Sequence, residues 1–424
     1  MTAADVATSA ADVAAALRTT ATIRERAGVL LVRARSGESA WFGESAWFTV
    51  DDAAFAVAAH EVAELTRSRF PDLQIPYHSR WRHFEAGGID RVADLTARIA
   101  GLDAGERART LIDVTLVSVL LDAGAGPDWS FRESSPDGDR VYTRSEGLGV
   151  ASWHAFGAGL FSSDADVPLR VDAAGLRALT AEQLAGAFQV TGDNPLVGLD
   201  GRLDVLHRLG GVLAADPEVF GADGRPGGLF DVITAGGPVT AEAILGAVLD
   251  HLSPIWPSDN TYTDESGTVV ALGDCWFHPA LGDCTPAPGR MPFHKLSQWL
   301  TYSLIEPLEL SGYAVTGLDG LTGLPEYRNG GLLLDTGVLT PLDPAFTDRA
   351  WQVDDEAVVE WRALTVALLD EIADAVRAEL GVTATRLPLA CVLEGGTWAA
   401  GRVTAARLRG GLPPFTIVSD GTVF

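Results

Sequence analysis

The sequence predicts a mostly α-helical protein with minor β structure, arranged as a single helical domain. Apolar residues recur at helical spacing through most of the chain, and strand-like runs are few. Hydrophobic residues make up 47% of the chain, which is ample for a core. We expect helices over 22–35, 51–69, 147–160, 173–188, 202–214, 240–252, 295–310 and 354–380, and two more within 95–121. We expect strands at 268–272, 387–393 and 415–418.

Signals in the first third of the chain define its earliest elements. Residues 1–20 are rich in alanine and are expected to form a flexible N-terminal segment or a frayed helix. A tandem Gly-Glu-Ser-Ala-Trp-Phe hexapeptide fills 37–48, and two copies are too few for a solenoid. A local duplication in a loop is therefore favoured over a ligand-stacking element. Phe55 and Val62 give the next segment its helical spacing, and the second helix within 95–121 is strongly apolar.

Two threonines mark the starts of later helices. Thr180 and Thr240 are each followed by Ala-Glu, and a threonine before an early acid is typical of a helix N-cap. The segments 215–239 and 257–290 are rich in glycine, proline and aspartate. They are expected to be long loops, which are often functional in a compact domain.

The expected organisation is one integrated domain. No charge run or low-complexity tract resembles a linker between domains. We therefore expect residues 21–424 to fold together, with 21–100 as an N-terminal elaboration of a helical core at 101–424.

The charge of the chain limits its partners. It carries 57 acidic and 31 basic residues, a formal net charge of 31 − 57 = −26. A surface this acidic repels nucleic-acid phosphates and anionic lipids, so neither is expected as a partner. The sequence lacks both a signal-peptide pattern and the run of about 18 apolar residues that a membrane span needs. Three cysteines are too few for a disulfide scaffold, so a cytoplasmic protein is expected, with its oligomeric state left open.

Lysine usage singles out one residue. The 31 basic residues comprise 30 arginines and a single lysine, Lys295. An ammonium group is compact and can change its protonation state, whereas a guanidinium cannot. This favours a chemical role for Lys295 over chance survival on a surface.

Two polar stretches in the first half of the chain are candidate binding elements. Tyr77, His78, Arg80, Arg82 and His83 crowd a segment between a proline and a glycine pair, as suits an anion or sugar site. The alternative is a helix cap with Arg–Glu pairs. The second stretch, 144–154, contributes Glu146 and two glycines. The glycines permit either close approach of an anion to the backbone at a helix start or close packing of the helix.

The expected helix at 295–310 carries a polar face. Lys295, Gln298, Tyr302 and Glu306 recur at helical spacing, and His294 precedes them. In a chain whose solvated faces use arginine, this composition favours a pocket lining over a solvated face.

Two later stretches supply carboxylates. Glu326 follows a proline in a glycine-rich loop, with Arg328 two residues on, and is a candidate general base or cation stabiliser. Glu394 is expected to follow an apolar strand, and Trp398 offers a flat stacking surface. No dinucleotide fingerprint, P-loop, serine-hydrolase elbow or HExxH motif is present, so no cofactor is expected.

The chain resembles a known family over nearly its whole length. The resemblance is carried by 77–88, 113–129, 144–152, 188–196, 292–307 and 325–331. These stretches, above all Tyr-His-Ser-Arg-Trp-Arg-His-Phe at 77–84, are similar to an uncharacterised family associated with uracil catabolism in fungi and bacteria and tied to a ring-opening pathway.

A more distant resemblance supplies a reaction. Phe-His-Lys-Leu-Ser-Gln at 293–298, Pro-Glu-Tyr-Arg at 325–328 and Leu-Glu-Gly-Gly-Thr-Trp at 393–398 are similar, in order and approximate spacing, to motifs of the hydrolases that cleave queuosine 5′-phosphate. That family is mostly helical, resembles DNA glycosylases in fold and cleaves an N-glycosidic bond. The chain departs from it near Ser303, where an acid is replaced, and at Glu326, where the family has aspartate. The extra methylene shifts the carboxylate and leaves its role open.

The two resemblances together imply a substrate that is nucleoside- or nucleotide-like. Opening the ring of a uracil nucleotide leaves a ureido group on ribose phosphate, and an N-glycosidase would release urea from it. The resemblance implies catalytic roles for Glu326, Lys295 and Glu394, with Glu326 as base or cation stabiliser. The arginine cluster would hold phosphate or polarise the urea carbonyl. The candidate substrate-binding residues are Tyr77, His78, Arg80, Arg82, His83, Glu146, His294, Gln298, Tyr302, Arg328 and Trp398.

Two alternatives from other functional classes stay open. One is a non-catalytic carrier or scaffold that binds a pathway intermediate. The other is a metal-assisted amidohydrolase using Asp274, Cys275 and His278, with Cys284 nearby, although their spacing lacks the close pairs of a zinc site and no metal is expected.

Overall fold

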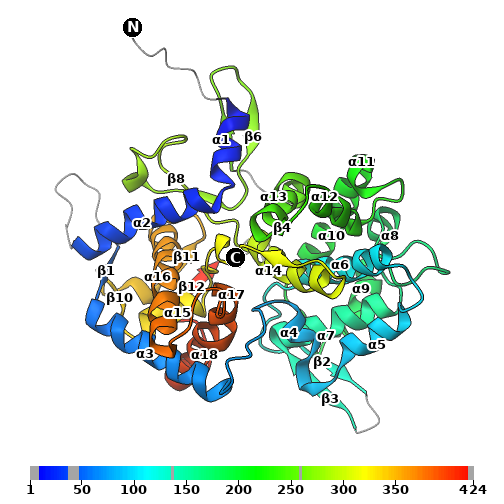
Figure 1. The fold of residues 1–424 in the computed structure, drawn as a ribbon, viewed down its shortest axis with the longest axis horizontal. Helices are drawn as coiled ribbons and strands as arrows, with labels where there is room; N and C mark the ends of the chain where they lie inside the picture. Colours follow the sequence, from blue (N-terminus) through cyan, green and yellow to red (C-terminus); the bar gives the residue numbers. More distant parts are fainter. Residues whose placement is uncertain (1–8, 37–46, 135–137, 257–259, 419–424) are drawn as a thin grey trace. The chain divides into compact units, whose positions relative to one another are not determined.

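The computed structural model describes residues 9–36, 47–134, 138–256 and 260–418 (Figure 1). The described residues are mostly helical, and their strands form only two-stranded sheets. The predicted class, mostly α with minor β, is confirmed. The more specific resemblance to DNA-glycosylase folds stays a prediction.

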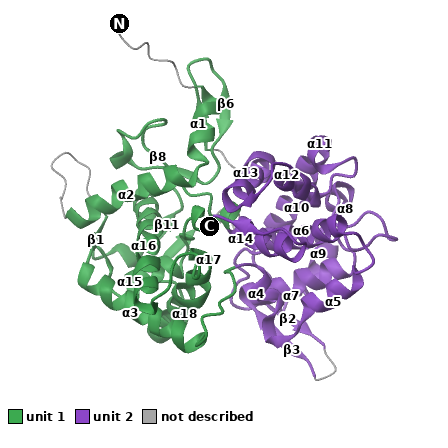
Figure 2. Cartoon of the chain, in the orientation of Figure 1, with its two compact units in different colours: residues 1–78, 258–298, 318–419 green, residues 79–257, 299–317, 420–424 purple. Residues whose placement is uncertain are grey.

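The chain divides into two compact units, each assembled from separate segments (Figure 2). Unit 1 comprises Met1–His78, Ser258–Gln298 and Leu318–Ser419. Unit 2 comprises Ser79–Pro257, Trp299–Gly317 and Asp420–Phe424. Neither unit follows the expected division at residue 100, since α5 and α6, on either side of it, belong to the same unit.

Unit 1 is built from long helices and short hairpins. Its helices are α1 (Ala10–Leu17), α2 (Thr20–Ser36), α3 (Asp52–Arg69), α15 (Asn329–Asp335), α16 (Glu356–Leu380), α17 (Leu389–Val392) and α18 (Trp398–Arg409), with the first turn of α14 (Lys295–Leu310) and the short turns η4 (Pro279–Leu281), η5 (Leu318–Gly320), η6 (Phe346–Asp348) and η7 (Leu393–Thr397). Its strand pairs are β1 (Phe48–Val50) with β10 (Leu339–Pro341), β5 (Thr261–Thr263) with β6 (Val269–Ala271) and β7 (Cys275–Phe277) with β8 (Arg290–Pro292), all antiparallel, and β11 (Ala350–Gln352) with β12 (Thr416–Val418), parallel.

Helix α16 forms the centre of unit 1. Its apolar residues are buried on all sides, as Trp361, Leu364 and Leu368 illustrate, and the helix packs against α2 and α3. Helix α15 packs beside α18, and Gly330 lies so close to Trp361 that any side chain there would overlap the indole ring. The glycine therefore brings the start of α15 against the core.

Unit 2 is a bundle of shorter helices around α6. The helices are α4 (Trp81–Phe84), α5 (Arg91–Arg98), α6 (Ala104–Leu120), α7 (Arg144–Gly157), α8 (Ala173–Ala178), α9 (Ala181–Ala187), α10 (Leu199–Ala215), α11 (Pro217–Phe220), α12 (Leu229–Ala235), α13 (Ala241–Leu252) and the rest of α14, with the turns η1 (Ala86–Gly88), η2 (Pro226–Gly228) and η3 (Ser253–Ile255). Two strand pairs complete it, the hairpin β2 (Ser130–Glu133) with β3 (Arg140–Thr143) and the parallel pair β4 (Val239–Thr240) with β9 (Val315–Thr316).

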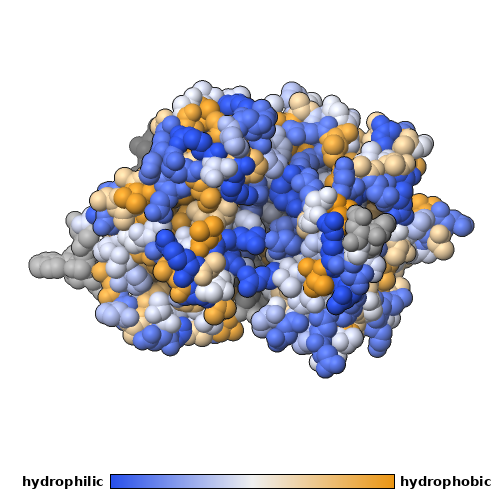
Figure 3. All heavy atoms as spheres, turned by 90° about the horizontal axis from the view of Figure 1, so that it is seen from below, coloured by the Kyte–Doolittle hydropathy of each residue, from blue (hydrophilic) through white to orange (hydrophobic). Residues whose placement is uncertain are grey.

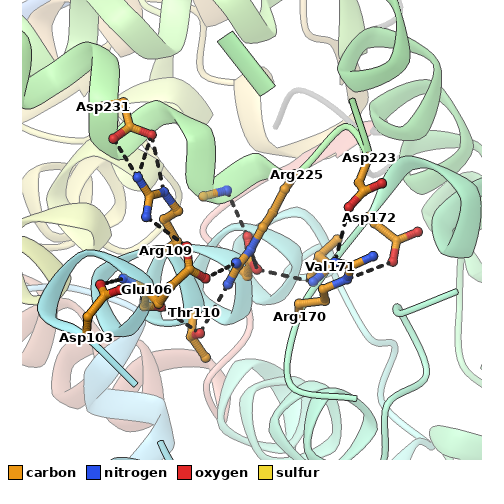
Figure 4. Close-up of polar contacts among 12 residues, drawn as sticks. Asp103, Glu106, Arg109, Thr110, Arg170, Val171, Asp172, Asp223, Arg225 and Asp231 are labelled. Atoms are coloured by element: carbon orange, nitrogen blue, oxygen red, sulfur yellow. Dashed lines mark hydrogen bonds and ion pairs between the residues drawn. The ribbon is translucent and has the colours of Figure 1, made fainter. Parts of the chain in front are cut away.

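A partly buried ion-pair network ties α6 to the loop before α12 (Figure 4). Arg225 donates to Asp113 Oδ2 at 2.7 Å and to Glu106 Oε2 at 2.6 Å, both on α6. The fully buried Asp113 also accepts the backbone N–H of Gly227 at 2.8 Å. Burial raises the pKa of Asp113, and Arg225 opposes that rise. Because each charge has a partner, we interpret the network as structural.

Most of the predicted helices are confirmed, and three local predictions are wrong. The expected strand at 387–393 is helical, because Pro388 caps α17. A short apolar run that is buried on all sides fits the period of a strand and that of a helix equally well, so the sequence did not distinguish them. The expected helix at 173–188 is broken by the capping box of Thr180. The segment 215–239, expected as a loop, contains α11 and α12. Within the N-terminal segment, where a frayed helix is one expectation, residues 10–17 form α1, capped by Ser9.

The hexapeptide repeat lies mostly outside the described residues, which resume at Trp47. No helix within the described ranges is long and apolar enough to cross a membrane. On the face drawn in Figure 3, hydrophilic and apolar residues are interspersed.

Candidate active site

Residues 75–78 lie along helix α17, and this contact sets the position of His78. The backbone N–H of His78 donates to the carbonyl of Ala390 at 2.9 Å, and the thiol of Cys391 donates to the carbonyl of Ile75 at 3.2 Å. His78 Nδ1 lies 2.9 Å from Glu394 Oε2. The two residues are only 6% and 8% exposed. An enclosed imidazole–carboxylate pair is thus the first feature of the site.

Glu394 lies in a π-helical turn, η7, between α17 and α18. Such turns widen the helix and are frequent at functional sites. Arg69 of α3 donates to the carbonyl of Glu394 and, at 2.8 Å, to that of the next residue. A Cβ on Gly396 would lie 2.5 Å from Val62 Cγ1 of α3, so only glycine lets this turn pack there. The glycine pair and Arg69 therefore fix the position of Glu394.

Glu326 caps the start of α15. Its two carboxylate oxygens accept the backbone N–H groups of Arg328 and Asn329, each at 2.7 Å. Burial raises the pKa of Glu326, while these hydrogen bonds and the charges of Lys295 and His78 lower it, and the net shift is upward. The carboxylate is therefore a stronger base than an exposed glutamate, with the lysine and the imidazole beside it.

Lys295 is the first residue of α14 and is buried. Its backbone N–H donates to Asp274 Oδ2 at 3.0 Å, which caps the helix. Both oxygens of Asp274 also bind Arg362, each at 2.8 Å. Burial alone would raise the pKa of Asp274, but the guanidinium of Arg362 holds it at about 2. A permanently ionised cap thus fixes the residue from which the lone lysine projects.

Two residues predicted to bind substrate have their polar atoms engaged within the fold. His294 is buried in a left-handed backbone conformation, φ 48°, and its Nε2 lies 3.1 Å from the carbonyl of Leu17. Burial lowers the pKa of His294. Gln298 is fully buried and exchanges hydrogen bonds with the side chain and the backbone of Thr322, at 2.6 and 2.8 Å. Both residues stabilise the start of α14 through these hydrogen bonds. Because their polar atoms are used in this way, direct contact with a substrate is disfavoured.

An aromatic side chain lies beside the imidazole of the pair. The ring of Trp398 lies 5.4 Å from that of His78, and the guanidinium carbon of Arg402 lies 4.8 Å from the Trp398 ring centroid. Tyr77 is half-buried. The Arg328 side chain turns away to the carbonyl of Gly411 at 3.1 Å, so this residue contacts Glu326 only through its backbone.

The predicted site residues divide between the two units. Unit 1 holds Tyr77, His78, His294, Lys295, Gln298, Glu326, Arg328, Glu394 and Trp398. Unit 2 holds Arg80, Arg82, His83, Glu146 and Tyr302. The boundary between the units falls directly after His78 and again after Gln298.

Within unit 2, Arg80 is the centre of an enclosed cluster. Its guanidinium is fully buried and contacts Asp122 Oδ2 and His83 Nδ1, each at 2.9 Å, and Ser118 at 2.7 Å. Burial lowers the pKa of Arg80, and the charges of Asp122 and Glu146 oppose this. The contacts are those of a structural hub, which argues against the predicted role of Arg80 as a phosphate ligand.

Arg82 lies between two glutamates in the same unit. It contacts Glu306 and, at 2.9 Å, Glu85, and the hydroxyl of Ser79 also donates to Glu306. Burial raises the pKa of Glu306 to about 7, and Arg82 opposes the rise. Tyr302, predicted on the same face, is fully buried. This is the alternative of Arg–Glu pairing that the sequence left open.

The three residues of the metal alternative are engaged elsewhere. Asp274 binds Arg362, His278 Nε2 lies 3.2 Å from Glu360, and burial raises the pKa of the Cys275 thiol to about 12. Among the residues that the structure describes, no three His, Cys, Asp or Glu side chains form a group that could hold a metal ion. Their contacts argue against these residues as a ligand set.

The family of the chain follows from comparison with known proteins. A family profile described as "Protein of unknown function (DUF1688)" matches residues 16–424. The chain belongs to this family. It is 41% identical over 361 residues to Protein urg3 of Schizosaccharomyces pombe, across 82% of this chain and 84% of that protein. It is 39% identical over 382 residues to Uracil catabolism protein 4 of Lachancea kluyveri, across 82% of this chain and 85% of that protein. The predicted recognition of a uracil-catabolism family of unknown function is confirmed.

Sequence reasoning missed one residue of this candidate site and gave another a different role. Arg69 ends α3 and carries no motif, yet it holds the carbonyls of η7. Asp274 stood out only as a metal ligand, whereas it caps the helix of Lys295. The Arg69 contact joins positions 325 residues apart, which no local pattern could reveal.

Proposed function

We propose that this chain is an N-glycosidase of uracil catabolism that releases urea from ribosylurea or its 5′-phosphate. The observation that carries the proposal is the neighbourhood of Glu326, a partly buried carboxyl with a raised pKa beside the charges of Lys295 and His78. The name of the relative from Lachancea kluyveri, Uracil catabolism protein 4, supports the pathway. The similarity of three motifs to queuosine 5′-phosphate hydrolases supports the reaction class.

The chemistry needs a carboxylate at the anomeric carbon. Breaking the C1′–N bond builds positive charge on the sugar ring, and an ionised carboxylate stabilises that charge and takes a proton from the attacking water. The raised pKa of Glu326 favours the role of base, while its hydrogen bonds to two backbone N–H groups and the charges of Lys295 and His78 favour the ionised form. Lys295 supplies a cation that can polarise the urea carbonyl.

Glu394 is assigned a different role from the one expected. Its Oε2 is engaged by His78 at 2.9 Å, and its Oε1 lies 3.5 Å from Arg69. Pairing with an imidazole favours a carboxylate that orients that imidazole over one that acts on the substrate. Glu326 therefore stands alone as the proposed base.

The decisive experiment measures urea and free sugar after mixing the full-length chain with ribosylurea and, separately, with its 5′-phosphate. We expect both products in equal amounts from at least one of the two. Both forms are needed because Arg80 is enclosed and Arg82 is paired with glutamates, so the phosphate role of this cluster is not supported by its contacts.

Glu326→Gln is the first variant to test. It keeps an oxygen to cap α15 but cannot accept a proton, so we expect turnover to fall about 10²- to 10⁴-fold. The matched control is Glu371→Gln. Glu371 lies on α16, is partly exposed and pairs with Arg35, so this variant should retain full turnover. Near-normal turnover of Glu326→Gln with an unchanged unfolding midpoint would refute the assignment.

Two other outcomes would identify the rival functions. Binding of either compound without any urea would favour a carrier of a pathway intermediate. Urea release that is abolished by a chelator and restored by a metal ion would favour the amidohydrolase alternative.

A further inference from the structure

The imidazole–carboxylate pair of His78 and Glu394 differs from the other such pairs among the described residues. His60 and Glu379 are joined at 2.9 Å, but the His60 side chain is 63% exposed. The side chains of His154 and His251, which also pair with carboxylates, are 48% and 25% exposed. His278 and Glu360 are buried, but Glu360 also accepts backbone N–H groups of the strand β1 region, as a structural anchor does. His78 is enclosed, and its charge acts on Glu326, the proposed base.

We propose that His78 is the general acid that protonates the departing ureido group and that Glu394 is the positioning residue that holds it. This proposal rests on the proposed N-glycosidase function and extends it to the leaving group. A ureido anion is a very poor leaving group, so cleavage of its bond to ribose needs a proton donor on the side away from the attacking water.

Glu394 selects the tautomer that this role requires. A carboxylate only accepts hydrogen bonds, so Nδ1 of His78 must carry a hydrogen and donate it to Glu394 Oε2 at 2.9 Å. The transferable proton is then on Nε2. The same carboxylate stabilises the imidazolium before transfer, as the orienting acid of a catalytic triad does.

The surrounding structure prevents the pair from reorienting. The π-helical turn, held by Arg69 and packed on α3 through its glycines, fixes Glu394. The Trp398 ring, 5.4 Å away, lies beside the imidazole. The backbone of His78 is tied to Ala390 at 2.9 Å. A proton donor must be held in this way if its proton is to reach one atom of the substrate.

The step balances with water as the co-substrate. The C1′–N bond breaks, its electron pair stays on nitrogen, and that nitrogen takes the proton from His78 Nε2. The oxygen of water forms the new C1′–O bond and gives one proton to Glu326. The products are urea and the free sugar, and transfer of one proton from Glu326 to His78 restores the enzyme.

The test compares two substrates that differ in their need for acid. Ribosylurea requires protonation of its leaving group, whereas p-nitrophenyl riboside releases a phenolate that leaves unprotonated at neutral pH. We expect His78→Gln to lower kcat about 10²-fold or more on ribosylurea and only a few-fold on p-nitrophenyl riboside. Added imidazole should restore part of the lost rate on ribosylurea in a His78→Ala variant.

Glu394→Gln provides the readout for positioning. We expect a smaller loss on ribosylurea and a shift of the alkaline limb of the pH–rate profile to lower pH, because the imidazolium loses its counter-charge. The control is His60→Gln, which removes an imidazole–carboxylate contact of the same length on an exposed surface. It should leave kcat on both substrates unchanged.

The outcomes separate this proposal from the proposed function. If His78→Gln lowers kcat by the same factor on both substrates, and imidazole does not restore the rate of His78→Ala, the acid role is overturned. The proposed N-glycosidase function would still hold. An unmodified protein that releases urea from neither ribosylurea nor its phosphate would overturn both.

Discussion

At the scale of the single residue, Glu306 combines burial with incomplete charge compensation. Its carboxyl contacts Arg82 and Ser79, but burial still raises its pKa to about 7 from the ordinary 4.5. The folded chain therefore holds this proton more tightly than the unfolded chain between pH 4.5 and 7. The free energy of unfolding must then decrease as pH rises through that window.

Glu306→Gln removes this titration. We expect the variant to gain stability relative to the unmodified chain as pH rises from about 5 to 8, by about 1–3 kcal/mol, because one pKa unit corresponds to about 1.4 kcal/mol. Denaturant unfolding at the two pH values measures the difference. Glu218→Gln, an exposed glutamate of the same unit, should show no such pH dependence. A stability difference that stays constant with pH would contradict the assignment.

Residue patterns singled out candidate site residues that the fold places in one unit. The lone lysine, the Pro-Glu-Tyr-Arg motif and the Glu-Gly-Gly-Thr-Trp motif all belong to unit 1, together with His78. The pattern could not reveal that Arg80 is enclosed or that Gln298 binds Thr322. Both facts depend on contacts between positions that are distant in sequence.

At the scale of the element, the start of α14 shows how one helix end is specified. Asp274 caps the helix, Arg362 neutralises Asp274, and His294 takes a left-handed conformation just before the first turn. A left-handed conformation is costly for a residue with a side chain and persists only where the surroundings enforce it. The helix end is therefore built around the position of Lys295.

Asp274→Asn should destabilise the protein and displace Lys295. Removing one partner of a buried ion pair leaves the other uncompensated, so we expect a loss of about 3–5 kcal/mol. Thermal unfolding measures this loss, and turnover per folded molecule measures the displacement. The control is Asp335→Asn, which breaks a bidentate pair with Arg409, whose side chain is 27% exposed. It should lower the stability less than Asp274→Asn does and leave turnover per folded molecule unchanged. Equal effects of the two variants would contradict a special role for this cap.

The segment at 387–393 shows why element type was predicted wrongly. Its apolar run has no polar residue to reveal a period, and all of its residues are buried. The helical form follows from Pro388 at the N-cap and from contacts with residues 75–78. Glu394 consequently lies on a helical turn and not at the end of a strand.

At the scale of the whole molecule, the net charge of −26 is the dominant electrostatic property. Most surface ion pairs contribute little stability, so self-repulsion among the excess carboxylates is the larger contribution. Within the described residues, exposed apolar side chains are interspersed with polar ones on the face drawn in Figure 3.

Salt should therefore stabilise the protein. Raising the ionic strength from about 0.02 to 0.2 M shortens the screening length and weakens the repulsion. We expect the melting temperature to rise by about 1 °C, which corresponds to about 1 kcal/mol for a chain of this size. Sodium and potassium chloride should act equally if screening is the cause. A fall in melting temperature would show that attractive ion pairs outweigh the repulsion.

The sequence by itself determined the helical class and most helix positions, and it singled out Lys295, Glu326 and Glu394 as candidate site residues. These properties depend on local chemistry, namely apolar period, capping threonines and short motifs, which act over a few residues. Only the tertiary structure decided which polar residues have their hydrogen-bonding atoms engaged within the fold. It also decided that the apolar run at 387–393 is helical and that Glu394 pairs with His78 across 316 positions. Burial and charge pairing are set by neighbours in space, and a linear pattern does not contain them.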